Sequence, residues 1–300
     1  MKRMPKIHRH VPVAVAIILG LTCSSCLYTK RVILRHGKKV SGATAPTLRT
    51  ASRDELNTRI SNLYNAIMSF QATVDMTPSI GSVYTASITE IKDVRAHVLF
   101  RKPNEIRILG QYPVVRTTAF DMVSNGVDFK VHLVAKNLFV EGANSAPANS
   151  KNKLENLRPE AFLSSMLIRP ADTASEIPWL IDQTDEDNAI YILYFAKIGP
   201  NREFLGLPRA VWFDRIDLSI VRQTAYDMDG ALISDTRYSK WQPYNGVMFP
   251  AHIDINRPKD GYGVVLDVVD MKMNTSLTDE QFVLNRPEGS TLQLIGAPKP

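Results

Sequence analysis

The spacing of apolar and polar residues changes twice along the chain, and each change predicts a different structure. Residues 11–21 are uncharged, residues 52–69 carry apolar side chains at helical spacing, and beyond residue 90 apolar and polar residues alternate. Recurrence at every third or fourth position is typical of an amphipathic helix, and strict alternation is typical of a half-buried strand. The pattern therefore predicts an apolar leader, a leading helix and a domain built mainly from strands.

Two helices are predicted. The leading helix covers residues 53–69, because Ser52 and Glu55 have the spacing of a capping box. Its apolar face is formed by Leu56, Ile60, Leu63, Tyr64 and Ile67. A shorter helix is predicted from Pro159 to Leu167, because proline is favoured in the first helical turn. The apolar face of this shorter helix is formed by Phe162, Leu163, Met166 and Leu167.

Strands are predicted wherever apolar residues alternate with polar ones or form a short run between turn signals. In the first half of the domain the segments are 94–100, 106–108 and 127–133, and the turns are 102–104, 125–126 and 141–142. A polar excursion over residues 143–158 separates them from the second half. The later segments are 189–198, 210–213, 218–226, 232–241, 249–256 and 264–274. The total of about ten or eleven strands, in an antiparallel arrangement, has the spacing of one sandwich or barrel.

The apolar leader has the features of a secretion signal. Four basic residues precede residues 11–21, and a run of small residues follows them. A bilayer span needs roughly 20 apolar residues, so a transmembrane anchor is the weaker interpretation. Residues 1–25 are therefore predicted to be a signal peptide.

The end of the leader resembles a bacterial lipobox. Ser24 and Ser25 are the small residues that precede the acylated cysteine of such a motif, which predicts lipid attachment at Cys26. Attachment at Cys23 is the alternative, and it would place Thr22 before the cleavage point. An ordinary cleaved signal, with two unmodified or mutually paired cysteines, is a further alternative. Because residue 27 is leucine rather than the aspartate of the Gram-negative retention rule, the resemblance implies an outer-membrane lipoprotein that faces the periplasm.

The positive charge of the chain is concentrated before the domain. The net charge is +6, but the first 53 residues carry 11 Lys and Arg and no acidic residue. Residues 54–300 then hold 25 Lys and Arg against 30 Asp and Glu, so a nucleic-acid-binding face is not indicated. Residues 26–50 are predicted to be a flexible basic tether. Its charges fit either anionic lipid headgroups, at about 1 kcal/mol per residue, or plain solvation.

No residue pattern indicates an enzyme. Of the six histidines, His97, His132 and His252 alternate with apolar strand residues, and the others precede the domain. Zincin, nucleophile-elbow and P-loop motifs are absent, and the acidic run 182–187 lacks the glycine and glutamate of a calcium loop. The sequence therefore predicts no catalytic residues, no metal and no cofactor apart from the covalent lipid.

Several short segments resemble recurring positions of the LolA/LolB-like periplasmic lipoprotein carriers and their uncharacterised lipoprotein relatives. These segments are 100–107, 124–126, 212–214, 221–223, 244–250 and 287–289. The resemblance covers about residues 55–296 and implies one domain over 51–300. It also implies an incomplete antiparallel barrel, closed by helices around an apolar interior that holds acyl chains. In the carriers an arginine inside the barrel bonds to the lid, and Arg107 or Arg222 is the candidate here.

A sheet of ten or more strands curls or splits into layers, and a barrel of that size leaves room for a ligand. The candidate cavity-lining residues are Val98, Phe100, Ile106, Ile108, Phe129, Val131, Ile192, Tyr194 and Trp212, and the shorter helix is the candidate lid. Each of these residues fits a packed core equally well. The predicted function is a membrane-anchored protein that binds the acyl chains of lipids or lipoproteins. The alternative is a sensor or assembly lipoprotein that uses the same barrel to bind an envelope protein.

Overall fold

The computed structural model divides into two units, residues 1–44 and 45–300, and the account below concerns the second. The predicted signal peptide, both cysteines, most of the predicted tether and most of the polar excursion lie outside the described residues. The structure describes residues 47–82, 84, 87–90, 93–146, 158–185 and 188–296.

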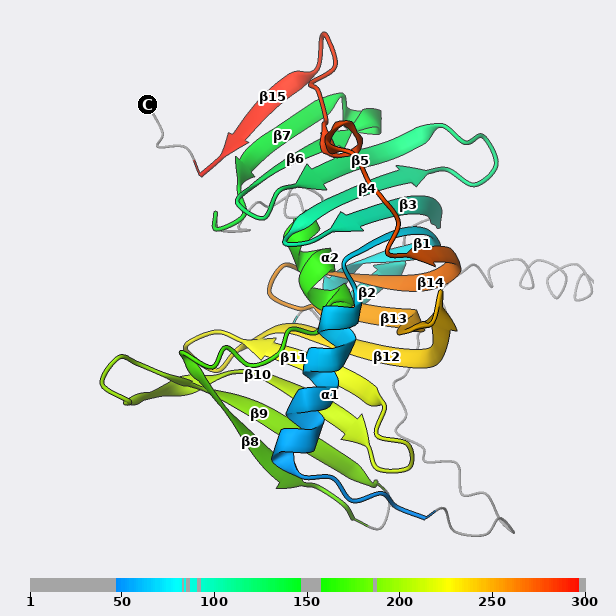
Figure 1. Ribbon diagram of the computed structural model, residues 1–300. Coiled ribbons are helices and arrows are strands. Elements are labelled where there is room, and N and C mark those ends of the chain that lie inside the picture. The colour runs from blue at the N-terminus through cyan, green and yellow to red at the C-terminus, as the bar shows by residue number, and fades with distance from the viewer. Residues whose placement is uncertain are drawn as a thin grey trace, which may run out of the picture. The chain divides into compact units, whose positions relative to one another are not determined.

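The described part of the domain contains one 15-stranded sheet, two α-helices and short 3-10 turns (Figure 1). The helices are α1 (Arg53–Ala66) and α2 (Pro159–Met166). The strands before α2 are β1 (Ser69–Ser82), β2 (Ser87–Glu90), β3 (Val94–Arg101), β4 (Glu105–Gln111), β5 (Thr118–Ser124), β6 (Asp128–Leu133) and β7 (Leu138–Ala143). Those after α2 are β8 (Glu176–Asp182), β9 (Ile190–Ile198), β10 (Phe204–Asp214), β11 (Ile220–Tyr226), β12 (Leu232–Tyr244), β13 (Val247–Arg257), β14 (Tyr262–Met273) and β15 (Thr291–Ile295).

The sheet is open rather than closed into a barrel. The strand order is β15-β7-β6-β5-β4-β3-β1-β14-β13-β12-β11-β10-β9-β8, with β2 paired to β1. Neighbouring strands are antiparallel except for β15, which runs parallel to β7. The prediction of a mainly β fold with a leading helix and a short second helix is therefore confirmed. The prediction of ten or eleven strands, all antiparallel, is wrong.

The strands missed from the sequence have local causes. The predicted leading helix ends three residues early, because Ile67 is extended, and β1 then begins at Ser69. The turn predicted at residues 141–142 is wrong, because β7 continues through Gly142. A Cβ atom on Gly142 would lie 2.6 Å from the backbone oxygen of Ile295. Glycine is therefore needed for the close approach of β15, and does not mark a turn.

The capping box at the start of α1 is confirmed. Ser52 donates its backbone N–H to Glu55 Oε2 at 2.7 Å, and Glu55 donates its own N–H to Ser52 Oγ at 3.2 Å. These two bonds satisfy amide groups that have no partner within the helix. The buried side chains of α1, Leu56 and Ile60, join the core of the sheet.

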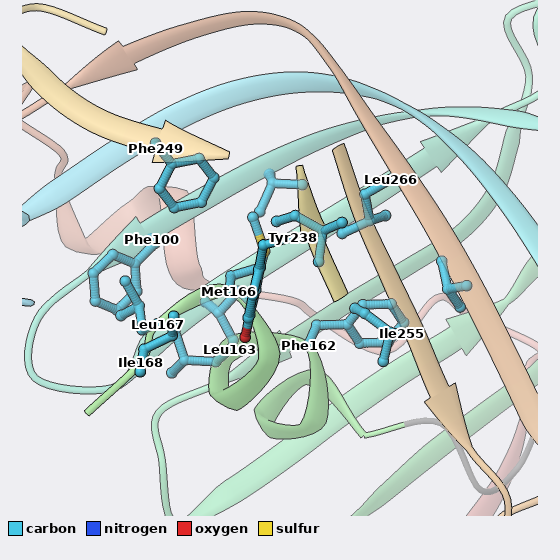
Figure 2. Close-up of a cluster of buried hydrophobic side chains, with 14 of the residues drawn as sticks. Phe100, Phe162, Leu163, Met166, Leu167, Ile168, Tyr238, Phe249, Ile255 and Leu266 are labelled. Carbon is cyan, nitrogen blue, oxygen red and sulfur yellow. The ribbon is translucent and has the colours of Figure 1, made fainter. Parts of the chain in front are cut away.

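Both helices lie on the same face of the sheet, which we call the helix face (Figure 1). The α2 helix is buried on almost every side, and its apolar residues pack on strands from both halves of the domain (Figure 2). Leu163 has no exposed area, and Phe162 and Met166 are nearly as buried. The opposite face, which we call the outer face, carries no α-helix of the described residues. The short 3-10 helix η5 (Asp279–Phe282) lies on it at β4, where Arg107 donates to the backbone oxygen of Gln281 at 3.0 Å.

Candidate functional site

The predicted lining residues of the first half are brought together on the helix face. They belong to one core cluster with the four predicted lid residues, Phe162, Leu163, Met166 and Leu167. Each of these lining residues is almost fully buried. The set is Val98, Phe100, Ile106, Ile108, Phe129 and Val131. The helix face is thus an apolar surface that α2 covers, and contact of these side chains with an acyl chain stays a prediction.

The other three predicted lining residues lie on the outer face, away from α2. Tyr191, Leu193 and Phe195 join the core cluster, so Ile192 and Tyr194, which alternate with them, point to the opposite side. Trp212 pairs with Ile192 and therefore shares its face. The sequence could not separate the two faces, because residues 190–196 of β9 carry no charged side chain, and the exposed Lys197 at the end of the strand alternates in phase with the buried residues.

A groove of about 810 Å³ runs along α1 on the helix face. Its apolar floor comes from one turn of the helix and from β11–β13: Leu63, Ile220, Trp241, Val247 and Met248. Its polar rim is formed by Asp54, Glu55, Thr58, Arg59, Asn62, Asp217 and Ser219. Small-molecule sites have volumes of roughly 300–1,000 Å³ and are mostly apolar with a few polar groups. The groove has this size, but half of its lining residues are polar.

The indole of Trp241 is held in place in the floor of the groove. Its Nε1–H donates to the backbone oxygen of Ile220 at 2.9 Å, and its ring lies 6.3 Å from that of Tyr238. The groove residues were not predicted, because they come from segments more than 150 residues apart and share no periodic pattern.

The inner end of the groove leads to α2. A narrow pocket of about 20 Å³ shares Leu63, Trp241 and Met248 with the groove, and its other walls include Met166 and Leu167. A cavity of that volume holds about one water molecule. The narrow pocket thus lies between the groove and the C-terminal end of α2.

Side chains from the sheet hold α2 through its backbone carbonyls. Tyr238 donates its hydroxyl to Ser165 O at 2.8 Å, and Gln223 donates Nε2–H to Ser164 O at 3.1 Å. Arg209 donates to the backbone oxygens of Arg169 and Pro170, just beyond the helix, at 2.7 and 2.9 Å. Burial raises the pKa of Tyr238 well above its usual value, so the hydroxyl stays protonated and remains a donor.

The two arginines suggested by the resemblance have other partners. Arg107 binds Asp121 at 2.7 Å and the backbone oxygen of Gln281 at 3.0 Å. Arg222 binds Asp235 at 2.6 Å. The segment that follows α2 is instead held by Arg209 on β10.

Comparison with protein-family models and with curated proteins gives no match to this sequence. Among solved structures, a LolA superfamily protein from Nitrosomonas europaea matches with a TM-score of 0.50 and 17% identity, over 78% of this chain and 99% of that one. A DUF1329 family protein from Desulfovibrio piger ATCC 29098 matches with a TM-score of 0.50 and 15% identity, over 77% and 95% of the two chains. The chain has a LolA-like fold. The likeness stated from the sequence is therefore confirmed at the level of the fold.

Both predicted helices have a defined position in this fold. The leading helix forms one wall of the groove, and the predicted lid covers the apolar surface of the first half-sheet.

No helix within the described ranges is long and apolar enough to cross a membrane. In the same ranges, no three His, Cys, Asp or Glu side chains are grouped so that they could hold a metal ion.

Proposed function

We propose that this protein is a membrane-anchored carrier or acceptor of acyl chains, from lipids or lipoproteins, in the bacterial envelope. The lipid at Cys26 holds it at the outer membrane, facing the periplasm. An acyl chain enters the groove beside α1 and extends toward α2. The observation that carries the proposal is the apolar floor of the groove, which continues to the apolar face of α2.

The chemistry of the groove fits a chain with an apolar tail and a polar end. Each buried methylene contributes about 0.8 kcal/mol, so a floor of Leu63, Ile220, Trp241 and Met248 favours a hydrocarbon tail. The rim carries acidic and basic groups, which favour a hydrated polar group at the mouth. The LolA-like fold adds support by likeness of architecture.

In this proposal α2 acts as a lid. It is eight residues long, and displacing it would open the apolar surface formed by β3, β4 and β6 to the inner end of the groove. The hydrogen bonds from Tyr238, Gln223 and Arg209 would break in this step. Each such bond contributes about 1 kcal/mol net, so a long acyl chain can compensate for their loss.

The test uses the full chain purified from membranes in mild detergent. Native mass spectrometry should detect a non-covalent acyl ligand in addition to the covalent lipid at Cys26. In a Trp179→Phe/Trp212→Phe variant, Trp241 is the remaining tryptophan. Its fluorescence should fall when dibromopalmitate is added, because Trp241 lines the groove. A chain without exchangeable ligand, unquenched Trp241 and a specific bound protein would instead identify a sensor or assembly lipoprotein.

A further inference from the structure

The outer face of β8, β9 and β10 is apolar and uncovered by any described segment. Ile177, Trp179 and Ile181 project from β8 with 45%, 64% and 43% of their surface exposed. In the sheet, Trp179 is paired with Tyr194, and Ile181 with Ile192, which in turn is paired with Trp212. We call these six residues the outer apolar face. The three on β8 are exposed, Tyr194 and Trp212 are half-buried, and Ile192 is buried. Soluble proteins rarely leave contiguous apolar surface of this kind open to water, so it indicates a contact surface.

The composition of this face is typical of a membrane interface. Tryptophan and tyrosine concentrate where one end of the side chain is in lipid and the other is hydrated. The rings of Tyr194 and Trp212 lie 6.4 Å apart, and the guanidinium of Arg222 lies 4.8 Å from the Trp212 ring centre. Arg222 is also paired with Asp235, so the face has a charged border on β11 and β12. An apolar patch with aromatic residues and a charged edge matches the boundary between acyl chains and headgroups.

The edge of β8 is poorly suited to another strand. It is the last strand in the sheet order, with its outer side unpaired among the described residues (Figure 1). Pro178, in its middle, has no backbone N–H to contribute to a ladder, and proline on an edge strand disfavours strand addition. This argues against a second copy that pairs through β8.

The described chain begins at the end of β8, on the helix-face side, because Asp182 alternates with Ile181 and Arg215 lies over the ring of the buried Tyr191. Arg49 donates its N–H to Arg215 O at 2.7 Å, and Arg215 binds Asp182 at 3.0 Å and Thr184 at 2.7 Å, at the end of β8. Leu48 and Ile216, which flank this contact, are exposed apolar residues. Twenty residues, 27–46, separate Cys26 from the first described residue, Thr47. The tether predicted from the sequence would have a root-mean-square span of roughly 25 Å, so a lipid at Cys26 would hold the end of β8 close to the bilayer.

We infer that the outer apolar face lies against the lipid bilayer that holds the anchor. The inference rests on the anchoring proposed above. Trp179, Ile177 and Ile181 enter the headgroup boundary, and the chain leading from the tether reaches the domain at the end of the same strand. Because the helix face is on the opposite side of the sheet, the groove beside α1 is then turned toward the periplasm, where an incoming cargo can reach it.

The test places single tryptophans in the full lipidated chain, reconstituted in phosphatidylethanolamine–phosphatidylglycerol vesicles with brominated acyl chains. A Trp212→Phe/Trp241→Phe variant reports Trp179. A control replaces all three native tryptophans by phenylalanine and adds Val114→Trp, at an exposed apolar position in the turn between β4 and β5. Relative to vesicles without bromine, Trp179 fluorescence should fall at least twofold, and the control signal should not change.

A matched pair of substitutions tests the same contact. Ile177→Ser/Ile181→Ser removes exposed apolar side chains, so it costs little stability, and it should relieve most of the quenching of Trp179. Val114→Ser/Val115→Ser removes a similar exposed pair and should leave the quenching unchanged.

Flotation of the vesicles and the mass of the Cys26 peptide test the anchoring separately from the orientation, which the quenching of Trp179 tests. A chain that neither floats nor carries lipid contradicts the anchoring. A chain that floats but has unquenched Trp179 overturns the proposed orientation and leaves the anchoring intact. The outer apolar face is then covered by a second copy or by another protein. Trp179 fluorescence that falls as the protein concentration rises, and falls equally in vesicles without bromine, would also overturn the orientation. It would indicate that a second copy covers the outer apolar face.

Discussion

Met248 is the clearest single residue at which to test the groove. It lines both the groove and the narrow pocket beside α2, yet it is partly exposed, so changing it should not disturb the fold. Met248→Glu places a charge on the apolar floor, and desolvating that charge opposes binding of a hydrocarbon tail. We expect dibromopalmitate quenching of Trp241 to weaken at least tenfold. Met228→Glu, at an exposed turn position, is the matched control and should bind as the native chain does. Equal binding by both variants would place the ligand elsewhere.

Tyr238 tests how the lid is held. Its hydroxyl donates to Ser165 O, and burial keeps it protonated by raising its pKa. Tyr238→Phe removes this one bond, which should cost about 1 kcal/mol and leave a buried carbonyl without its donor. Hydrogen exchange followed by mass spectrometry should show faster exchange in residues 159–167. Tyr84→Phe, at an exposed position, should leave that exchange unchanged. Slow exchange in both variants would mean that packing alone holds α2.

At the scale of elements, the ion pair between β8 and β10 makes the attachment of the α2 segment sensitive to acid. Burial by itself raises the pKa of Glu176, but its hydrogen bonds and ion pair with Arg209 outweigh burial, so the pKa is lowered overall. The stabilisation is therefore present above the unfolded pKa of about 4.3 and is lost as pH falls through the lower folded value. Glu176→Gln should unfold at lower urea than the native chain at pH 7, and the difference should disappear in acid, once Glu176 is protonated in both the folded and the unfolded state. A difference that persists in acid would rule out the ion pair as its cause.

Met166 on α2 tests whether an acyl chain extends from the groove toward the lid. Met166→Ala removes a buried wall of the narrow pocket and should cost about 2–5 kcal/mol of unfolding free energy. The vacated volume extends the groove toward α2, so palmitate should bind several-fold more tightly. Met76→Ala, on β1 in the same core cluster, should cost a similar amount without any gain in binding. Fluorescence of Trp241 and urea unfolding measure the two effects, and equal affinities would argue against a path toward α2.

The elements predicted well are those with local signals. Ser52 and Glu55 mark the start of α1, and the alternation in β3 gives both its position and its buried face. The nearly unbroken apolar run of β9 predicts a strand but does not show which of its sides faces the helices. Ile192 and Tyr194 are therefore predicted to line the cavity, although they lie on the outer face, away from α2. The parallel pairing of β15 with β7 and the groove joining Leu63 to Met248 depend on distant segments. No local pattern contains that information.

At the scale of the whole molecule, the two faces of the sheet have separate roles in the proposals. The helix face is covered by α1 and α2 and holds the groove, whereas the outer apolar face of β8, β9 and β10 is uncovered by any described segment. Anchoring, orientation and cargo binding therefore use different residues. Variants at Trp179, Met248 and Cys26 should separate the three properties.

The anchor itself is tested at the two leader cysteines. If Cys26 carries the lipid, Cys26→Ala should abolish both acylation and cleavage before that residue, so the chain should keep residues 1–25 and show no acyl mass on its N-terminal peptide. Cys23→Ser should give the same acylated N-terminus as the native chain, because residue 23 is removed with the leader. Mass spectrometry of the N-terminal peptide, with flotation of the membranes, measures both outcomes. Acylation that survives in Cys26→Ala and disappears in Cys23→Ser would move the anchor to Cys23. It would lengthen the tether by three residues and leave the orientation argument intact.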